Sequence, residues 1–304
     1  MNSFKNLLCY RFQPSESFSA EQLENSLQSH PFTPCGRHEL QRTGWVAPCF
    51  FSDQLVFSSN DYHLITLLKE ERILPASVIK DEVSQRVSKI EADEARKVYK
   101  KEKDQIKDEV VLELLPRAFS KRQSIRALIM PNEGWIVIDA SSFARGDLLL
   151  NELREALGSL KVRPMNVNQA PASIMTQWIQ QEDAIPKGFD IGDECELRDT
   201  SAEGGVIRVK GQPLHSEEIV AHLESMQVTR LALNWESQLT FLLYSDLSLH
   251  RLKLHADYAD QLEQDRPEDE YADFDASVAR TGLEMARLLP AIIDSFGGEP
   301  ASES

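Results

Sequence analysis

Two short segments of the chain carry pairs of basic side chains at positions i and i+2. The segment GVIRVKG holds Arg208 and Lys210, and SLHRLKL holds Arg251 and Lys253. Successive side chains of a β-strand point to opposite faces, so each pair shares one face and the aliphatic residues between its members share the other. Lysine and arginine side chains in this arrangement bind phosphate groups, a contact that carries no base-sequence information. The chemistry that these residues predict is the binding of a polyanion.

Three further cations extend the pattern. Lys161 and Arg163 have the same spacing in LKVRP, and Arg230 opens the strand-like segment RLALNW. Basic residues are also common on any solvent-facing strand, and a single pair is explained equally well by solvation alone. Three such pairs favour a polyanion-binding surface, provided that two or three of the strands lie in one sheet.

A second basic feature is the stretch LLPRAFSKRQSIR, which runs from Leu114 to Arg126 and contains four cations and no acid. Arg117, Lys121 and Arg122 belong to it, and they surround a lone aromatic residue, Phe119. A phenylalanine between a helix and a hairpin is most simply explained as a core residue. An exposed Phe119 would instead wedge into a nucleic-acid groove or pack against a second subunit.

The motifs of common enzyme classes are missing from the sequence. There is no dinucleotide-binding or P-loop glycine pattern, no nucleophile elbow and no H-E-x-x-H zinc motif. The four cysteines are scattered without a C-x-x-C pair, and Cys35 and His38 have ligand-like spacing but no second pair. We therefore expect no catalytic activity, no metal and no cofactor.

The charge of the chain is strongly and unevenly acidic. The formal net charge is −16, and thirteen acids against three bases fall in residues 257–304 alone. A basic surface would therefore stand out on an otherwise anionic protein. No run of about 18 apolar residues predicts a membrane span, and no secretory signal is recognisable, so we expect a cytoplasmic protein.

The pattern of elements predicts an α+β fold. Residues 77–115 contain neither Gly nor Pro and have few apolar positions, which indicates a projecting helix, or two helices, solvated on most of its surface. SIRALIM and GWIVIDA follow as a predicted hairpin with a turn at residues 131–134. We expect a strand-rich body in two similar halves with a projecting tip of long helix and hairpin. The predicted parts are residues 1–75 and 139–256 for the body, 76–138 for the tip and 257–304 for an acidic helical segment.

Several longer stretches together resemble one family. The segments FKNLLCYR, KEERILPASVIK, EARKVYKKEKDQIKDEV, LLPRAFS, GGVIRVK, LALNW, SLHRLKL and FGGE occur in order over nearly the full length. In these stretches the chain is similar to the RdgC family of recombination-associated, nucleoid-associated DNA-binding proteins. The collinear order is more specific than any single motif.

The resemblance implies a ring-shaped homodimer around a hole that admits double-stranded DNA, bound with little sequence preference. It implies that such a ring restrains RecA-dependent recombination by occupying the DNA, with RecA as a further partner, and that it has no catalytic activity. The residues expected to bind DNA are Arg117, Phe119, Lys121, Arg122, Arg208, Lys210, Arg230, Arg251 and Lys253. His250 stands where a base would be expected, which would weaken the lining slightly.

Two other functions stay open at this point. The chain would alternatively be a protein–protein regulator that acts on the recombinase or on a replication protein, with the acidic segment as its contact. A nuclease would require a metal-binding cluster of acids, and no such cluster can be chosen among so many carboxylates.

Overall fold

One large antiparallel sheet organises the molecule. The computed structural model describes residues 4–14, 18–199, 201 and 204–301, and within these ranges it contains twelve strands in one sheet and eight α-helices. Every pairing between these strands is antiparallel. The predicted mixture of helices and strands is therefore confirmed, and the strands form a single sheet.

The sheet has two parts of five strands each, which we call the first and second parts. The first part is, in spatial order, β2 (Gln41–Val46), β4 (Tyr62–Ile73), β5 (Phe119–Met130), β6 (Trp135–Asp139) and β1 (Leu7–Phe12). The second part is β12 (Leu249–Leu254), β11 (Leu239–Tyr244), β10 (Met226–Trp235), β8 (Phe189–Asp199) and β9 (Val206–Lys210). β3 (Val56–Ser59) pairs with β4, and β7 (Val162–Pro164) pairs with β1.

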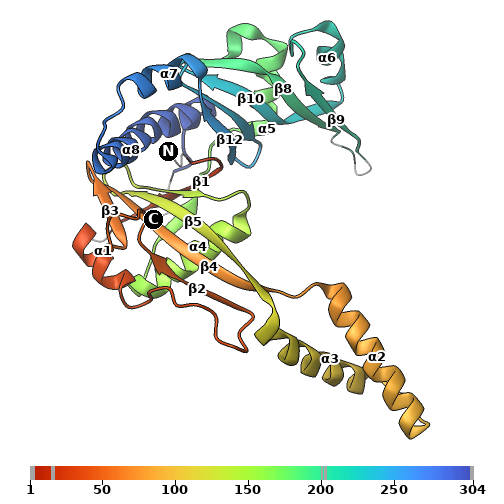
Figure 1. Ribbon diagram of the computed structural model, residues 1–304. Coiled ribbons are helices and arrows are strands. Elements are labelled where there is room, and N and C mark those ends of the chain that lie inside the picture. Colours follow the sequence, from red (N-terminus) through yellow and green to blue (C-terminus); the bar gives the residue numbers. More distant parts are fainter. Residues whose placement is uncertain (1–3, 15–17, 200, 202–203, 302–304) are drawn as a thin grey trace.

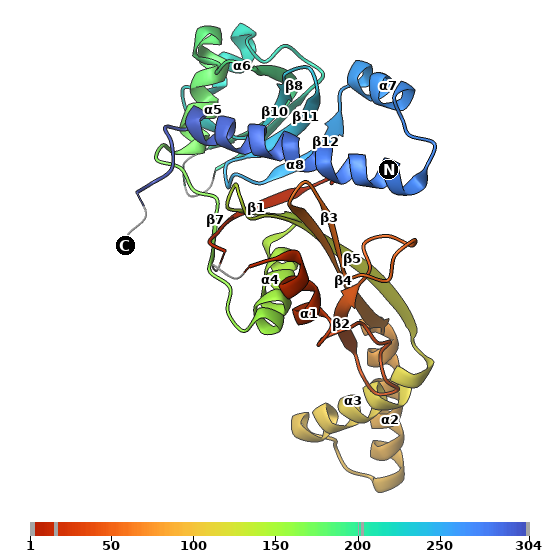
Figure 2. The same ribbon diagram turned by 90° about the vertical axis from the view of Figure 1, so that its left-hand side faces the viewer.

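The two parts meet where β1 pairs with β12 through Leu7 and Leu249. This junction is short, and α8 (Glu270–Ser295) crosses it, as Figure 2 shows. The buried residues of α8, among them Met285, Leu288 and Ile292, belong to a core that contains residues of both parts. Long-range packing of one helix, together with the short junction, therefore fixes the two parts relative to each other.

Helices cover one face of each part. α1 (Ala20–Leu27) and α4 (Phe143–Leu157) close a core with β1, β4, β5 and β6. α5 (Pro171–Gln180) packs on β10 and joins the core of α8. Two further helices, α6 (Glu217–His222) and α7 (Ala256–Gln264), lie at the margin of the second part, and short 3₁₀ turns occur at Leu115–Arg117 and Glu182–Ala184.

The projecting segment is a pair of helices. α2 (Ala76–Glu94) ends at Ala95, whose φ of 49° is left-handed, and α3 (Lys100–Leu114) runs back beside α2. Val87, Val98, Ile106 and Val110 form a small core between them. The few apolar residues of this segment therefore pack the two helices against each other. The segment forms two helices and not one.

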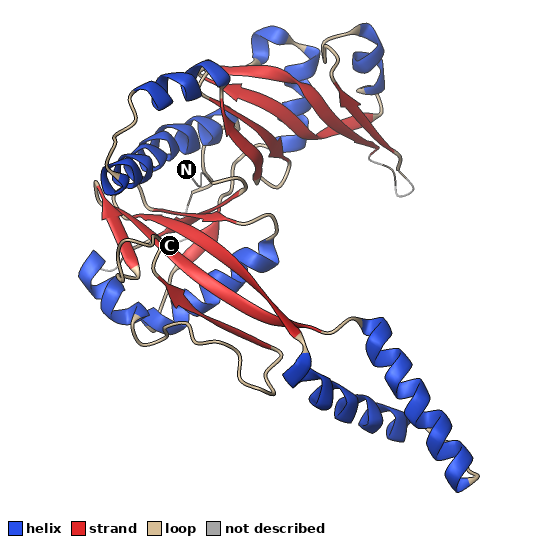
Figure 3. Cartoon of the chain, in the orientation of Figure 1, coloured by secondary structure: helices blue, strands red, loops and turns tan. Residues whose placement is uncertain are grey.

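The chain has the outline of an open crescent in Figure 1, with the two parts of the sheet as its arms. α2 and α3 project from the lower arm, and the colouring by secondary structure in Figure 3 shows a layer of strands with helices beside it in both arms. The ring and the dimer that the resemblance implies concern more than one chain.

Gly282 lets α8 approach the first part of the sheet. A Cβ at this position would lie 2.1 Å from Cδ2 of Tyr62, a contact that no side chain tolerates without a shift of the helix. Alanine normally favours a helix over glycine by about 1 kcal/mol. Here the clash outweighs that preference, so we predict that Gly282→Ala lowers the free energy of unfolding by about 2 kcal/mol.

Urea denaturation measures this change. Leu283→Ala is the control, because Leu283 is the next residue of α8 and is 53% exposed, and its replacement should change stability by less than about 0.5 kcal/mol. A Gly282→Ala protein more stable than the parent would contradict the proposed packing of α8 on Tyr62.

Candidate nucleic-acid interface

A row of charged and aromatic side chains runs across four strands of the second part. In the register of the sheet Arg208 of β9 lies opposite Glu196 of β8, Glu196 lies opposite Arg230 of β10, and Arg230 lies opposite Tyr244 of β11. The neighbours Leu197, Val209 and Leu231 point the other way, into the core. Strand alternation thus places the row on the face opposite the helices.

Glu196 is the centre of this row. Its side chain is only 3% exposed, and its carboxylate accepts from Nε of Arg208 at 2.8 Å and pairs with the guanidinium of Arg230 at 3.0 Å and of Arg198 at 3.6 Å. Burial, the largest influence, acts to raise the pKa of Glu196, but Arg208 and Arg230 together outweigh it, so the pKa is lowered. The group is therefore ionised at neutral pH and carries the negative charge that lets three arginines lie side by side.

An aromatic stack continues the row toward β12. The guanidinium of Arg230 lies 4.4 Å from the centre of the Tyr244 ring, and Tyr244 stacks on His250 with centroids 4.0 Å apart. Nε2 of His250 is 2.9 Å from Oγ of Ser248. Burial, the largest cause, lowers the pKa of His250; Asp246 opposes this shift, and nearby Arg230 and Arg251 add to it.

The second predicted pair, on β12, lies on the same face but in an irregular backbone. Arg251 has a φ of 54°, and its backbone N–H donates to Oδ1 of Asn6 at 3.3 Å. Its guanidinium donates to Glu194 of β8, and this bond is the largest cause of the lowered pKa of Glu194. Lys253 is exposed and lies opposite Thr240 of β11.

We call this surface the basic face. It carries six cations and the two acids that bind them: Arg198, Arg208, Lys210, Arg230, Arg251 and Lys253 with Glu194 and Glu196. The sequence prediction included five of the cations and missed Arg198 and both acids. Alternation in the segment ECELR of β8 already places Glu194, Glu196 and Arg198 on one face, so strand parity would have revealed them.

The basic stretch near the tip lies elsewhere and is divided between two faces. β5 begins at Phe119, so the stretch is largely strand and not a joint. Phe119 and Lys121 alternate with Ile125 of the α1–α4 core, whereas Arg122 lies on the other face. In Figure 1 this end of β5 lies on the lower arm, beside the tip, and β9 lies on the upper arm. One chain therefore does not bring the two predicted groups together.

Phe119 is the most exposed large apolar residue in the described part of the chain, at 84%. Of the two alternatives for Phe119, the core position is therefore excluded and the exposed position holds, because β4 and β5 extend beyond the helices that cover the sheet. Ile73, directly opposite Phe119 in the register, is also exposed. Arg117 is exposed in the turn that precedes β5.

Arg122 repeats the arrangement of Arg208. It lies opposite Glu70 of β4, whose side chain is 4% exposed, and its Nε donates to Oε2 of that carboxylate at 3.1 Å. Lys121 is exposed and lies opposite Glu71. Lys69 is the main cause of the lowered pKa of Glu71, and Lys121 adds to the shift.

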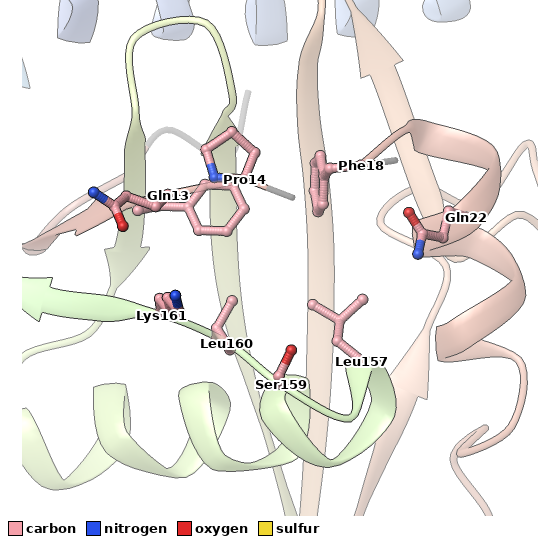
Figure 4. Close-up of a pocket in the computed structure, with 9 residues that line it drawn as sticks. Gln13, Pro14, Phe18, Gln22, Leu157, Ser159, Leu160 and Lys161 are labelled. Atoms are coloured by element: carbon pink, nitrogen blue, oxygen red, sulfur yellow. The ribbon is translucent and has the colours of Figure 1, made fainter. Parts of the chain in front are cut away.

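The remaining predicted pair, Lys161 and Arg163, lies at the edge of the first part. Both are exposed, and Arg163 of β7 lies opposite Arg11 of β1 in the register of the sheet. Lys161 borders a hollow of about 430 Å³ between β1, α1 and the segment after α4 (Figure 4), lined by Phe12, Gln13, Pro14, Phe18, Gln22, Leu157, Ser159, Leu160 and Lys161. This pair does not contribute to the basic face.

The described residues contain no group of three or more His, Cys, Asp or Glu side chains that could hold a metal ion. Cys9 and Cys195 are buried, and burial raises their pKa to about 12 and about 11, so neither is a reactive thiolate. None of the described helices combines the length and the apolar character that a membrane span requires.

The chain is similar to known proteins over nearly all its length. The family model described as "Putative exonuclease, RdgC" matches residues 3–299. A protein named "Recombination-associated protein RdgC" from Pseudomonas fluorescens (strain Pf0-1) is 44% identical over 299 residues, which is 97% of each chain. Proteins of the same name from Pseudomonas putida (strain GB-1) and Pseudomonas aeruginosa (strain LESB58) are each 45% identical over the same share of both chains.

The stack on the basic face makes a prediction about His250. Replacing Arg230 with Gln removes a neighbouring cation, so the pKa of His250 should rise toward its ordinary value of about 6.5. The shift would be measured by NMR titration of the imidazole C–H signals.

Arg198→Gln, on the same face but not among the charges that act on His250, should leave the pKa of His250 unchanged. Equal shifts in both variants would contradict the stack. Because the folded-state pKa is lowered, the unfolded chain binds this proton at higher pH, and His250 costs stability as the pH falls through about 6.5.

Proposed function

The chain belongs to the RdgC family, and from that premise we propose that it binds double-stranded DNA through phosphate contacts, without sequence preference, and does not cut it. By occupying the DNA it restrains RecA-dependent recombination, and it works in the nucleoid. The observation that carries the proposal is the basic face, where six cations gather on one side of a sheet in a chain of net charge −16.

The distribution of charge favours DNA over other ligands of the basic face. Glu194 and Glu196 are already bound by arginines, so the face keeps an excess of positive charge. The last sixth of the chain carries most of the net negative charge and forms α7 and α8. Repulsion from that surface would direct the DNA backbone to the basic face.

The lack of sequence preference follows from the kind of contact. Base readout requires an element that enters a groove and presents donors and acceptors to the base edges. The cations of the basic face lie on the flat surface of a sheet, and three of them are arginines held by one carboxylate. Such a surface would contact phosphates through their charge, and these contacts do not depend on the base sequence.

A ring-shaped homodimer would join the two basic regions that a single chain keeps apart. The exposed pair Phe119 and Ile73 lies where the tip leaves the first part, and apolar side chains of this size favour a protein contact. We propose a second copy of the chain as the occupant. Two crescents that met in this way would enclose the DNA, with Arg117, Lys121 and Arg122 near the contact.

The family description names a nuclease, whereas the curated relatives are named for recombination. We propose binding without cleavage. Two-metal or one-metal phosphodiester hydrolysis depends on a cluster of carboxylates or histidines, and the described residues do not contain one. The alternative of a protein–protein regulator would rest on the acidic α7–α8 segment, and its binding would not depend on DNA.

The first prediction of this proposal concerns salt. A labelled duplex of scrambled sequence should bind tightly at low salt, and log K should fall with log salt by about 0.9 for each phosphate contacted. Arg208→Glu/Lys210→Glu reverses two charges of β9 and should weaken binding by about 100-fold or more. Fluorescence anisotropy across a salt series measures both effects.

Lys100→Glu/Lys101→Glu is the matched control, since it makes the same change of charge on exposed residues at the start of α3. It should lose far less affinity. Equal losses of affinity in the two double variants would show that the basic face does not bind the DNA. If the parent protein does not bind the duplex, a protein–protein regulator is favoured. In the presence of Mg²⁺ the duplex should stay full length; release of nucleotides would favour the nuclease.

The second prediction concerns the dimer. Phe119→Ser removes the exposed aromatic side chain at the proposed contact and should shift the molecular mass toward the monomer at low micromolar concentration. Light scattering after gel filtration measures it. Leu112→Ser, at a half-exposed apolar position of α3, is the control and should leave the mass unchanged. A Phe119→Ser protein with the parent's mass at every concentration would contradict this contact.

A further inference from the structure

Two buried glutamates occupy matching places beside two candidate DNA-binding arginines. Glu70 lies directly opposite Arg122 across β4 and β5, and Glu196 lies directly opposite Arg208 across β8 and β9. Both glutamates are 3% exposed as whole residues. In both pairs Nε of the arginine donates to Oε2 of the glutamate, at 3.1 Å and 2.8 Å.

The two arginines remain largely open to solvent although they are anchored. The side chain of Arg122 is 55% exposed and that of Arg208 is 72% exposed. A guanidinium has five N–H donors in one plane, so the bond from Nε leaves the four donors of the terminal nitrogens outside it. Two of those donors, one on each terminal nitrogen, form an edge that pairs with two phosphate oxygens.

An anchored arginine binds a phosphate more readily than a free one. A long side chain loses rotamer freedom when it is fixed by a ligand, and this loss weakens binding. The bond to a buried carboxylate fixes the arginine beforehand. The carboxylate itself is held within the sheet, and Glu196 is surrounded by Arg198 and Arg230 as well, so its charge is more than neutralised.

From this repeated geometry we propose that Glu196 and Glu70 are positioning residues of the DNA-binding surface, which hold Arg208 and Arg122 with their terminal N–H donors toward the phosphates. The inference rests on the proposed function. A simple electrostatic view predicts the opposite effect. In that view an acid on a DNA-binding face only repels the DNA, so its removal would tighten binding.

Glu196→Gln tests the inference because the two views predict opposite signs. The amide keeps the shape of the side chain and removes its charge. We expect about 10-fold weaker binding of the scrambled duplex at constant salt, together with a shallower salt dependence, because fewer phosphates are contacted. Glu224→Gln, an exposed acid between α6 and β10, is the matched control and should bind the duplex at least as tightly as the parent.

A double-mutant cycle separates positioning from a structural role. If Glu196 acts through Arg208, Glu196→Gln should weaken binding far less in an Arg208→Ala background than in the parent. The same loss in both backgrounds would overturn the positioning role. Tighter or unchanged binding by Glu196→Gln in the parent background would also overturn it.

Two further measurements keep the test independent of any one variant. Glu70→Gln with Arg122→Ala repeats the cycle in the first part, in case Glu196→Gln fails to fold. Without DNA, the Nε–H NMR signal of Arg208 should exchange slowly with water in the parent and quickly in Glu196→Gln. If the parent protein does not bind the duplex, the proposed function fails and this inference fails with it; if the parent binds and the cycle shows no coupling, only the inference fails.

Discussion

A single buried carboxylate lets the chain concentrate positive charge on one face of its sheet. Three arginines from three strands approach Glu196, and without its charge their mutual repulsion would favour conformations that hold the three guanidinium groups apart. Removing one partner of such a group leaves an uncompensated charge, which is why buried pairs are costly to break. Glu194, whose side chain is 26% exposed, binds one arginine of the same face, Arg251. The acids of the basic face are therefore what makes the face possible.

The rest of the fold can be understood as the support for that face. The strands of the second part turn their aliphatic side chains toward α5 and α8, and so their alternate positions are free to carry charge. α8 also holds the first part, which carries the tip and the second basic region. Most of the net negative charge falls in residues 257–304, which form the last two helices, so the excess of acid is separated along the chain from the basic face.

Strand parity predicted much of the site, because it is a local property. Arg208 and Lys210 alternate with core aliphatics in both sequence and structure. Partners across strands depend on register, and register is set by pairings between distant segments, so Glu196 was not recognised as the partner of Arg208 and Arg230. The left-handed backbone at Arg251 was likewise invisible, since it depends on contacts with the segment that precedes β1.

Some larger features of the fold could likewise be predicted from the sequence, and others could not. The scarcity of apolar residues in 77–115 predicted a projecting element, because a helix without a continuous apolar stripe cannot lie against a core. The sequence left Phe119 between a core position and an exposed contact, since its exposure depends on how far β4 and β5 extend past α1 and α4. The single twelve-stranded sheet was also beyond the sequence, because the pairing of Leu7 with Leu249 spans almost the whole chain.

Lysine footprinting in the presence of DNA tests the central claim most directly. The protein would be acetylated with and without an excess of duplex, and the modified lysines would be quantified by mass spectrometry. We expect strong protection of Lys210 and Lys253 and little change at Lys80 and Lys100 of the projecting segment. Equal modification of Lys210 and Lys253 with and without bound DNA would contradict the central claim.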